Sequence, residues 1–265
     1  MNIAKYPWLL DFSSPGGQEA IEAAARSVST EGVAIFPEFI TRDALDACIS
    51  ESRMKAQDAF QTDDYHNIYL LPGNDSSLSD NHPRNQLLRT QVASIAYDEL
   101  DYDGELARLY RSDILASLVG AVTRRDQCYH SIDPLGCCSV NVFHPPQGHA
   151  WHFDESEYST TLMLQKPTEG GAFEFTHPIR SCKSDMATEA VQAAMSEGRG
   201  VSELTFEPGT LSIFAGRYSL HRVTQVRGTM DRLVAVFTFS SEPDFVNSPE
   251  VQRMFWGREA LIGHV

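Results

Sequence analysis

The second half of the chain alternates apolar and polar residues in short stretches, which is the pattern of strands with one buried face. Residues 159–165 alternate in this way, two glycines follow in the turn sequence 167–171, and residues 172–175 are typical of a returning strand. Residues 209–221 predict another strand that ends at a histidine, and residues 232–239 predict the last strong strand. We therefore expect a strand-rich structure from residue 127 onward.

The first half of the chain has helical periodicity instead. Residues 17–28 are rich in strong helix formers and predict one helix. A second helix is predicted to begin after Thr41 as its N-cap and to run to about Phe60. Residues 32–36 predict a short buried strand between these two helices, and residues 103–124 predict one helix or two short ones.

Two segments interrupt this regular pattern. Residues 62–83 are polar, with Asn, Asp, Ser, Gly and Pro concentrated at 72–83, and they predict a long loop, which in a compact domain is usually functional or mobile. Residues 184–200 predict a helical insertion between two strands.

Short strands with Gly/Pro turns and mainly N-terminal helices predict an α+β fold with a jelly-roll core, that is, a double-stranded β-helix. We expect one integrated domain, in which residues 1–126 form a helical support and lid region and residues 127–265 form the roll.

Composition limits the possible partners and locations. The formal net charge of −15 over 265 residues argues against nucleic acid or an anionic membrane as a partner. No apolar run approaches the roughly 18 residues of a membrane span. Five cysteines without CxxC spacing suggest neither a disulfide framework nor a zinc site, and the N-terminus lacks the features of a signal peptide, so a cytoplasmic location is expected. A homodimer remains possible.

Four residues carry candidate chemistry. His152 and Asp154 are two positions apart, His221 follows 69 residues after His152, and Arg232 lies eleven residues further on. Two imidazoles and one carboxylate match the face with which non-haem Fe(II) oxygenases hold their metal, leaving the other positions for a co-substrate and O2. Arg232 offers a planar bidentate fork for a dicarboxylic acid. A His-x-Asp pair alone is a weak signal, but here the predicted strands surround it.

With these residues the chain resembles the Fe(II)/2-oxoglutarate-dependent dioxygenases over about residues 130–242. The resemblance includes the Gly170–Gly171 hairpin and the turn at residues 208–210. The chain is more closely similar to the small bacterial enzymes that halogenate or hydroxylate free amino acids such as lysine. That closer similarity rests on five segments: residues 133–136, 141–143, 148–152, 164–167 and 219–223.

The resemblance implies a cofactor arrangement. His152, Asp154 and His221 would bind Fe(II), and Arg232 would pair with the distal carboxylate of 2-oxoglutarate. A hydroxyl contact to this co-substrate would come from Thr224 or Thr238. The halogenating relatives lack the iron carboxylate, and chloride takes its position. Because this chain keeps Asp154, the resemblance points to hydroxylation with Fe(II), 2-oxoglutarate and O2.

The expected substrate is a small molecule, in particular an amino acid. His149 lies where the amino-acid-modifying relatives contact the substrate carboxylate. Arg84 and Arg89 are candidates for the same carboxylate, and the polar stretch 62–90 that carries them would close over the substrate.

A substrate amine has its own candidate partners, Asp133 and Glu155. Lysine-specific relatives place an Asn in the final strand where this chain has Val236, which argues against lysine itself.

The sequence leaves three functions open. The leading one is hydroxylation of a free amino acid or a similar small polar metabolite. A second keeps the same cofactors but has a carrier- or peptide-bound substrate, or ends in desaturation or cyclisation. A third is a jelly-roll binding protein that uses its metal only structurally.

Overall fold

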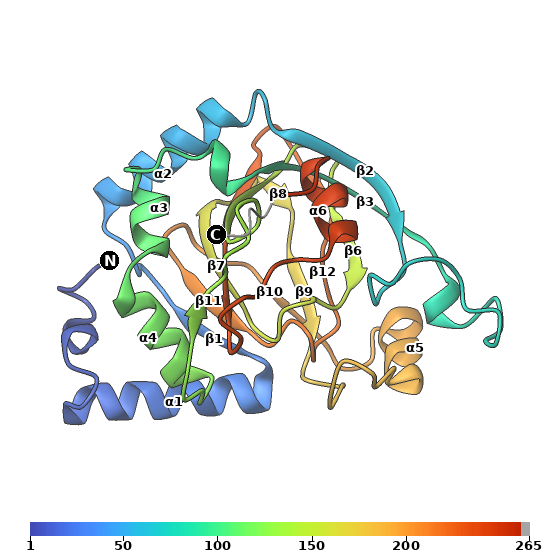
Figure 1. The fold of residues 1–265 in the computed structure, drawn as a ribbon, viewed down its shortest axis with the longest axis horizontal. Coiled ribbons are helices and arrows are strands. Elements are labelled where there is room, and N and C mark those ends of the chain that lie inside the picture. Colours follow the sequence, from blue (N-terminus) through green and yellow to red (C-terminus); the bar gives the residue numbers. More distant parts are fainter. Residues whose placement is uncertain (261–265) are drawn as a thin grey trace.

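The structure is a computed structural model that describes residues 1–260. Two antiparallel sheets form the centre of the molecule, and most helices lie to the outer side of the larger sheet (Figure 1). Residues of both sheets line one cavity between them. Facing antiparallel sheets with added helices are a jelly-roll core in an α+β fold, so the predicted fold class is confirmed.

The larger sheet has eight strands in the order β1-β11-β7-β14-β5-β3-β2, and β4 pairs with β14. The bounds of these strands are β1 Val33–Phe36, β2 Phe60–His66, β3 Leu88–Ile95, β4 Tyr129–His130, β5 Cys138–Phe143, β7 Ser159–Gln165, β11 Leu211–Phe214 and β14 Arg232–Ser240. Since β1, β2 and β3 come from residues 1–126, this region contributes strands to the roll as well as helices.

The smaller sheet has the order β10-β9-β12-β6. Its strands are β6 His149–His152, β9 Phe173–Thr176, β10 Val201–Leu204 and β12 His221–Val223. A separate two-stranded ribbon pairs β8, Glu169–Gly170, with β13, Val226–Arg227.

The two faces of the larger sheet differ because side chains alternate along each strand. One set of β14 residues belongs to the main apolar core: Leu233, Ala235, Phe237 and Phe239. The alternate set lines the cavity: Arg232, Val234, Val236 and Thr238. The same strand therefore stabilises the fold on one side and forms the wall of a site on the other.

Four helices pack around the main apolar core: α1 Pro15–Glu31, α2 Arg42–Lys55, α3 Glu105–Tyr110 and α4 Asp113–Val122. Two more helices lie elsewhere, α5 Thr188–Glu197 and α6 Pro249–Trp256, and single 3-10 turns lie at Pro7–Leu10, Pro83–Asn85 and Tyr97–Glu99. Thr41 is the N-cap of α2, as predicted, and its hydroxyl accepts a hydrogen bond from the Ala44 amide at 3.4 Å. The region 103–124 forms two helices, and α5 is the predicted insertion.

Two predictions in the first half of the chain were wrong. Helix α2 ends at Lys55 rather than near Phe60, and the predicted loop 62–83 begins inside β2. The register between β2 and β3 runs from Phe60↔Ser94 to His66↔Leu88. β2 is an edge strand with mostly exposed residues, and exposed charges such as those of Asp63 and Asp64 suit such an edge, so the strand shows little apolar signal.

The segment 209–221 also differs from its prediction. Its strand, β11, ends at Phe214, and a turn follows before His221 begins β12 in the other sheet. The distal histidine therefore lies at the start of a new strand rather than at the end of the predicted one. The sequence also gave no expectation of helix α6, which Ser248 caps by accepting a hydrogen bond from the Val251 amide.

Candidate active site

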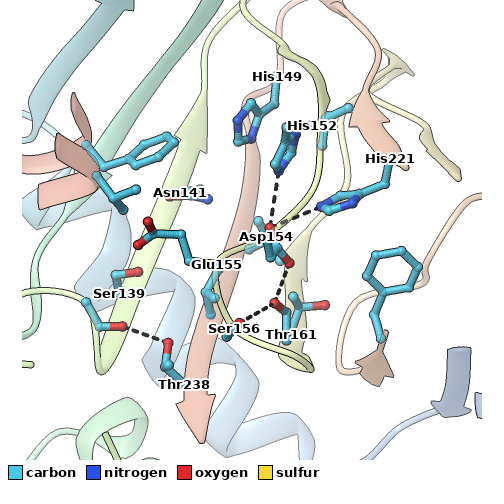
Figure 2. Close-up of a pocket in the computed structure, with 18 of the residues that line it drawn as sticks. Ser139, Asn141, His149, His152, Asp154, Glu155, Ser156, Thr161, His221 and Thr238 are labelled. Atoms are coloured by element: carbon cyan, nitrogen blue, oxygen red, sulfur yellow. Dashed lines mark hydrogen bonds and ion pairs between the residues drawn. The ribbon is translucent and has the colours of Figure 1, made fainter. Parts of the chain in front are cut away.

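Two neighbouring strands and the loop after one of them bring His152, Asp154 and His221 together. His152 is the last residue of β6, His221 is the first residue of β12, and the two are directly paired in the antiparallel register. Oδ1 of Asp154 lies 3.3 Å from Nε2 of each imidazole (Figure 2). The potential ligand atoms of all three residues lie within 4.8 Å of one another.

Backbone hydrogen bonds orient the two imidazoles. Nδ1 of His152 donates to the Ala150 carbonyl at 2.8 Å, and Nδ1 of His221 donates to the Ser219 carbonyl at 3.0 Å. These bonds leave the Nε2 lone pairs facing Asp154, which is the arrangement that metal-ligating histidines adopt. Ligand atoms about 2.0–2.2 Å from one metal and at right angles around it lie about 3 Å apart, so the triad fits a metal ion.

The surroundings of His152 and Asp154 keep these two groups in the forms that bind a metal. It lowers the pKa of His152 to about 4, helped by the neighbouring His221, so the imidazole is neutral at physiological pH. Burial acts to raise the pKa of Asp154, but the imidazoles of His221 and His152 hold it well below its usual value. A neutral His152 imidazole and an ionised Asp154 carboxylate are therefore available to bind a metal.

The cavity beside the triad has a volume of about 180 Å³. Strand β5 contributes Ser139, Asn141 and Phe143 to its wall, which lie opposite Val236, Val234 and Arg232 of β14 in the sheet register. Aromatic side chains of the smaller sheet and of β11 close the opposite side: Phe173 and Phe214. The cavity wall thus combines polar and apolar side chains, and the triad forms part of it.

Arg232 is the buried cation of this cavity. It is 3% exposed, and its Nε and Nη1 atoms have no hydrogen-bond partner among the described residues. Its guanidinium carbon lies 5.4 Å from the ring centre of Phe143, and burial lowers its pKa to about 10. A buried guanidinium without a protein anion needs an anionic ligand, because its desolvation is otherwise uncompensated. This is the feature that a dicarboxylic co-substrate would satisfy.

The two threonines considered for the co-substrate lie in different places. Thr238 lines the cavity, and its hydroxyl donates to the Gly136 carbonyl at 2.9 Å. Thr224 lines an outer groove instead, and its hydroxyl accepts a hydrogen bond from the Ala172 amide at 2.9 Å. The structure therefore brings Thr238, and not Thr224, to the same cavity as Arg232.

Of the substrate candidates, His149 and Glu155 line the cavity. The His149 ring stacks on His152 with centroids 3.7 Å apart, and its buried Nε2 has no partner among the described residues. Oε2 of Glu155 accepts a hydrogen bond from the Ser248 amide at 3.0 Å. Figure 2 shows the Glu155 carboxylate pointing toward the wall that Ser139 and Asn141 form.

The structure does not bring Arg84, Arg89 or Asp133 to the cavity wall. The buried Arg84 guanidinium donates to the backbone carbonyls of residues 72 and 73, and Arg89 forms a bidentate pair with Asp63 on the surface. Asp133 is fully buried and accepts hydrogen bonds from the amides of residues 135, 136 and 247. In the polar stretch 62–90, Leu70 is the residue that lines the cavity.

Sequence reasoning missed Trp256, which reaches the cavity from α6. Its indole Nε1 is buried and has no hydrogen-bond partner among the described residues. Phe255, its neighbour on α6, lies 5.5 Å from the His149 ring and also lines the cavity, so helix α6 forms part of the cavity wall. The capping sequence Ser248-Pro249 before an apolar segment was the signal that would have predicted this helix.

Comparisons with known proteins agree with this geometry. The structure is similar to the non-heme alpha ketoglutarate dependent epimerase SnoN from nogalamycin biosynthesis, with a TM-score of 0.59 and 11% identity over 84% of this chain and 81% of that one. It is also similar to AviO1 from Streptomyces viridochromogenes, with a TM-score of 0.58 and 13% identity over 86% and 97% of the two chains. A 2OG-Fe(II) oxygenase family oxidoreductase from Burkholderia pseudomallei matches with a TM-score of 0.52 and 15% identity over 84% and 91%.

The chain therefore shares the fold of Fe(II)/2-oxoglutarate oxygenases and carries a His-Asp-His group that could hold a metal ion. The model of the halogenase D (HalD) family matches residues 74–255, and the chain belongs to that family. No curated protein matches the chain by sequence. Among residues 1–260, no helix is both long and apolar enough to cross a membrane.

Proposed function

We propose that this protein hydroxylates an unactivated C–H bond of a free amino acid or a similar small polar metabolite, with Fe(II), 2-oxoglutarate and O2. One observation carries the proposal: a complete His152–Asp154–His221 triad shares its cavity with the buried cation of Arg232, which pairs with no anion within residues 1–260.

Different residues of the cavity would bind the metal and the co-substrate. The triad would hold Fe(II) through Nε2 of the two imidazoles and Oδ1 of Asp154, and Arg232 would bind the distal carboxylate of 2-oxoglutarate. Once bound, the iron, the keto acid and O2 supply the oxidant that removes a hydrogen atom from carbon. The apolar side chains around the triad, among them Phe173 and Phe214, exclude water from that step.

The polar groups of the cavity favour an amino-acid-like substrate. His149 and Trp256 each offer a ring nitrogen without a partner among the described residues, and either would contact a substrate carboxylate. Glu155 offers a carboxylate that would receive an amine. Val236 adds an apolar side chain to the cavity wall, at the position that argues against lysine itself.

Hydroxylation, rather than halogenation, is supported by Asp154. The matched family is described as a halogenase family. In the group of amino-acid-modifying enzymes that this chain resembles, however, the halogenating members lack the iron carboxylate. Here the carboxylate is present and faces both imidazoles. A halide would have to compete with it for the same position.

The experiment is a screen of the free amino acids with protein, Fe(II), 2-oxoglutarate, O2 and chloride, read by mass spectrometry. The proposal expects a product with one added oxygen and an equivalent amount of succinate. Chlorine in place of hydrogen would show halogenation, and loss of two hydrogens would show desaturation or cyclisation. Peptides and carrier-bound amino acids form a second substrate panel. His221→Ala is the inactive control, and succinate formation that survives in this variant would contradict the assignment of the metal ligands.

A further inference from the structure

The two oxygens of the Asp154 carboxylate have different partners. Oδ1 faces His152 and His221, as described above. Oδ2 faces away from them and accepts a hydrogen bond from the Ser159 hydroxyl at 2.5 Å. The Asp154 amide donates to the Gly216 carbonyl at 3.1 Å. Each carboxylate oxygen therefore has its own partners, and the backbone of Asp154 is held separately by Gly216.

Gly216 supplies the space for this carboxylate. Its φ lies outside the left-handed region, so its backbone conformation is open to other residues. A Cβ at this position would nevertheless overlap Oδ2 of Asp154, and it would lie 2.7 Å from Cγ and 2.9 Å from Cβ of the same side chain. Glycine is thus required here by the close approach of Asp154 and not by the turn itself.

Ser159 and Gly216 come from different strands of the larger sheet. Ser159 is the first residue of β7, and Gly216 lies in the turn after β11, its hydrogen-bonded neighbour. Phe214 pairs with Ser159 in this register, so the turn begins beside the serine. The larger sheet therefore sets the positions of Ser159 and Gly216, and the Asp154 side chain lies against them from the loop after β6.

We propose that Ser159 and Gly216 are positioning residues that hold Asp154 as a one-oxygen metal ligand. With Oδ2 bound to the Ser159 hydroxyl, Oδ1 alone is free to bind a metal, and the carboxylate occupies one coordination position instead of two. The neighbouring positions then remain open for a co-substrate and O2. The inference rests on the proposed function, because it takes the triad to be a metal site.

The test measures Co(II) affinity of the metal-free protein by absorption titration, in wild type, Ser159→Ala, Ser159→Thr and Gly216→Ala. We expect Ser159→Ala to weaken Co(II) binding about ten- to a hundredfold, the usual effect of removing a group that orients a metal ligand. Ser159→Thr keeps a hydroxyl and should retain more affinity than Ser159→Ala. Gly216→Ala should weaken binding as well, because the added methyl group displaces the carboxylate.

Two matched controls separate this role from general damage. Ser202→Ala removes a hydroxyl from an exposed position of β10, and Gly16→Ala adds a methyl group where no atom lies within 4 Å. Both should bind Co(II) like wild type. Thermal unfolding of metal-free Ser159→Ala should stay close to wild type, which shows that the variant is folded when its affinity is measured.

The outcomes distinguish the two ideas. Wild-type affinity in Ser159→Ala, or equal losses in Ser159→Ala and Ser159→Thr, would overturn the inference and leave the proposed function standing. If wild type itself binds no Co(II), the proposed function fails and the inference fails with it.

Discussion

Arg232 shows that a buried charged residue requires a partner that an exposed one does not need. On the surface, a guanidinium beside a strand is solvated and needs no explanation. Here it is buried, it faces a cavity, and two of its nitrogens have no partner among residues 1–260. Its desolvation is costly unless an anion enters the cavity, so the residue itself indicates the chemistry of its ligand.

Replacing Arg232 with Ala should raise the concentration of 2-oxoglutarate needed for half-maximal succinate formation by about ten- to a hundredfold. A charge-assisted bidentate contact contributes roughly 1.5–3 kcal/mol, which corresponds to that range. Metal content should stay near wild type, because Arg232 contacts none of the three metal-ligand candidates. Arg227→Ala removes an exposed guanidinium from β13 and is the control. An unchanged co-substrate requirement in Arg232→Ala would mean that another cation holds 2-oxoglutarate.

The residues of the site were predictable to different degrees. The spacing of His152, Asp154 and His221 identified them, because a metal requires specific side chains whose types are visible in the sequence. Ser159 and Trp256 were not predictable in this way, since serine and tryptophan occur in many roles. Their contribution depends on what lies opposite them in the fold.

At the scale of elements, strands β2 and β3 hold strand β6 through buried hydrogen bonds. The His66 imidazole and the Thr90 hydroxyl, one from each strand, lie 2.6 Å apart, and the Thr90 hydroxyl accepts from the Ala150 amide at 3.0 Å. Ala150 also accepts the hydrogen bond that orients His152. The β2–β3 hairpin therefore stabilises strand β6. This stabilisation depends on buried hydrogen bonds, which the alternation of apolar and polar residues in the sequence could not reveal.

Arg84→Ala and Arg89→Ala should differ in their effects, because the two guanidinium groups have different surroundings. Loss of the buried Arg84 leaves the carbonyls of residues 72 and 73 without their donor and should lower the free energy of unfolding by about 1–3 kcal/mol. Loss of the exposed pair between Arg89 and Asp63 should lower the free energy of unfolding much less, because water solvates both groups when they are unpaired. Urea unfolding measures both values.

Substrate affinity tests the original lid hypothesis in the same variants. Because neither guanidinium reaches the cavity wall, we expect Arg89→Ala to bind substrate like wild type. A marked loss of substrate affinity in Arg89→Ala, with stability preserved, would instead show that the stretch 62–90 closes over the substrate and brings this residue with it.

The elements themselves were predictable where one face is buried. The pattern predicted β7 and β14 because their alternation separates the apolar core from the cavity. It failed for β2, an exposed edge strand, and for the boundary between β11 and β12, because no periodicity marks a turn that carries the chain from one sheet to the other. Helix α6 was not predicted, although its N-cap Ser248 is visible in the sequence, because its 8 residues are too few to show helical periodicity clearly.

At the scale of the whole molecule, three buried imidazoles near the site tie stability to pH. Burial lowers the pKa of His66 and of His152, the latter to about 4, and places the pKa of His149 well below its usual value. In the unfolded chain each imidazole regains an ordinary pKa of about 6.5. The Asp154 carboxylate favours protonation of His152, but burial outweighs it.

The metal-free protein should therefore lose stability as pH falls from about 6.5 toward about 4. In that window the unfolded chain binds protons that the folded protein excludes, so the free energy of unfolding falls with each proton taken up, by up to about 1.4 kcal/mol per pH unit for each imidazole. Above about pH 7 these three groups are neutral in both states and contribute no slope. The measurement is the urea midpoint of metal-free protein across this range, compared with His149→Phe, which removes one of the imidazoles and should reduce the slope. If stability rises on acidification, or the slope is the same in both proteins, the buried imidazoles do not control it.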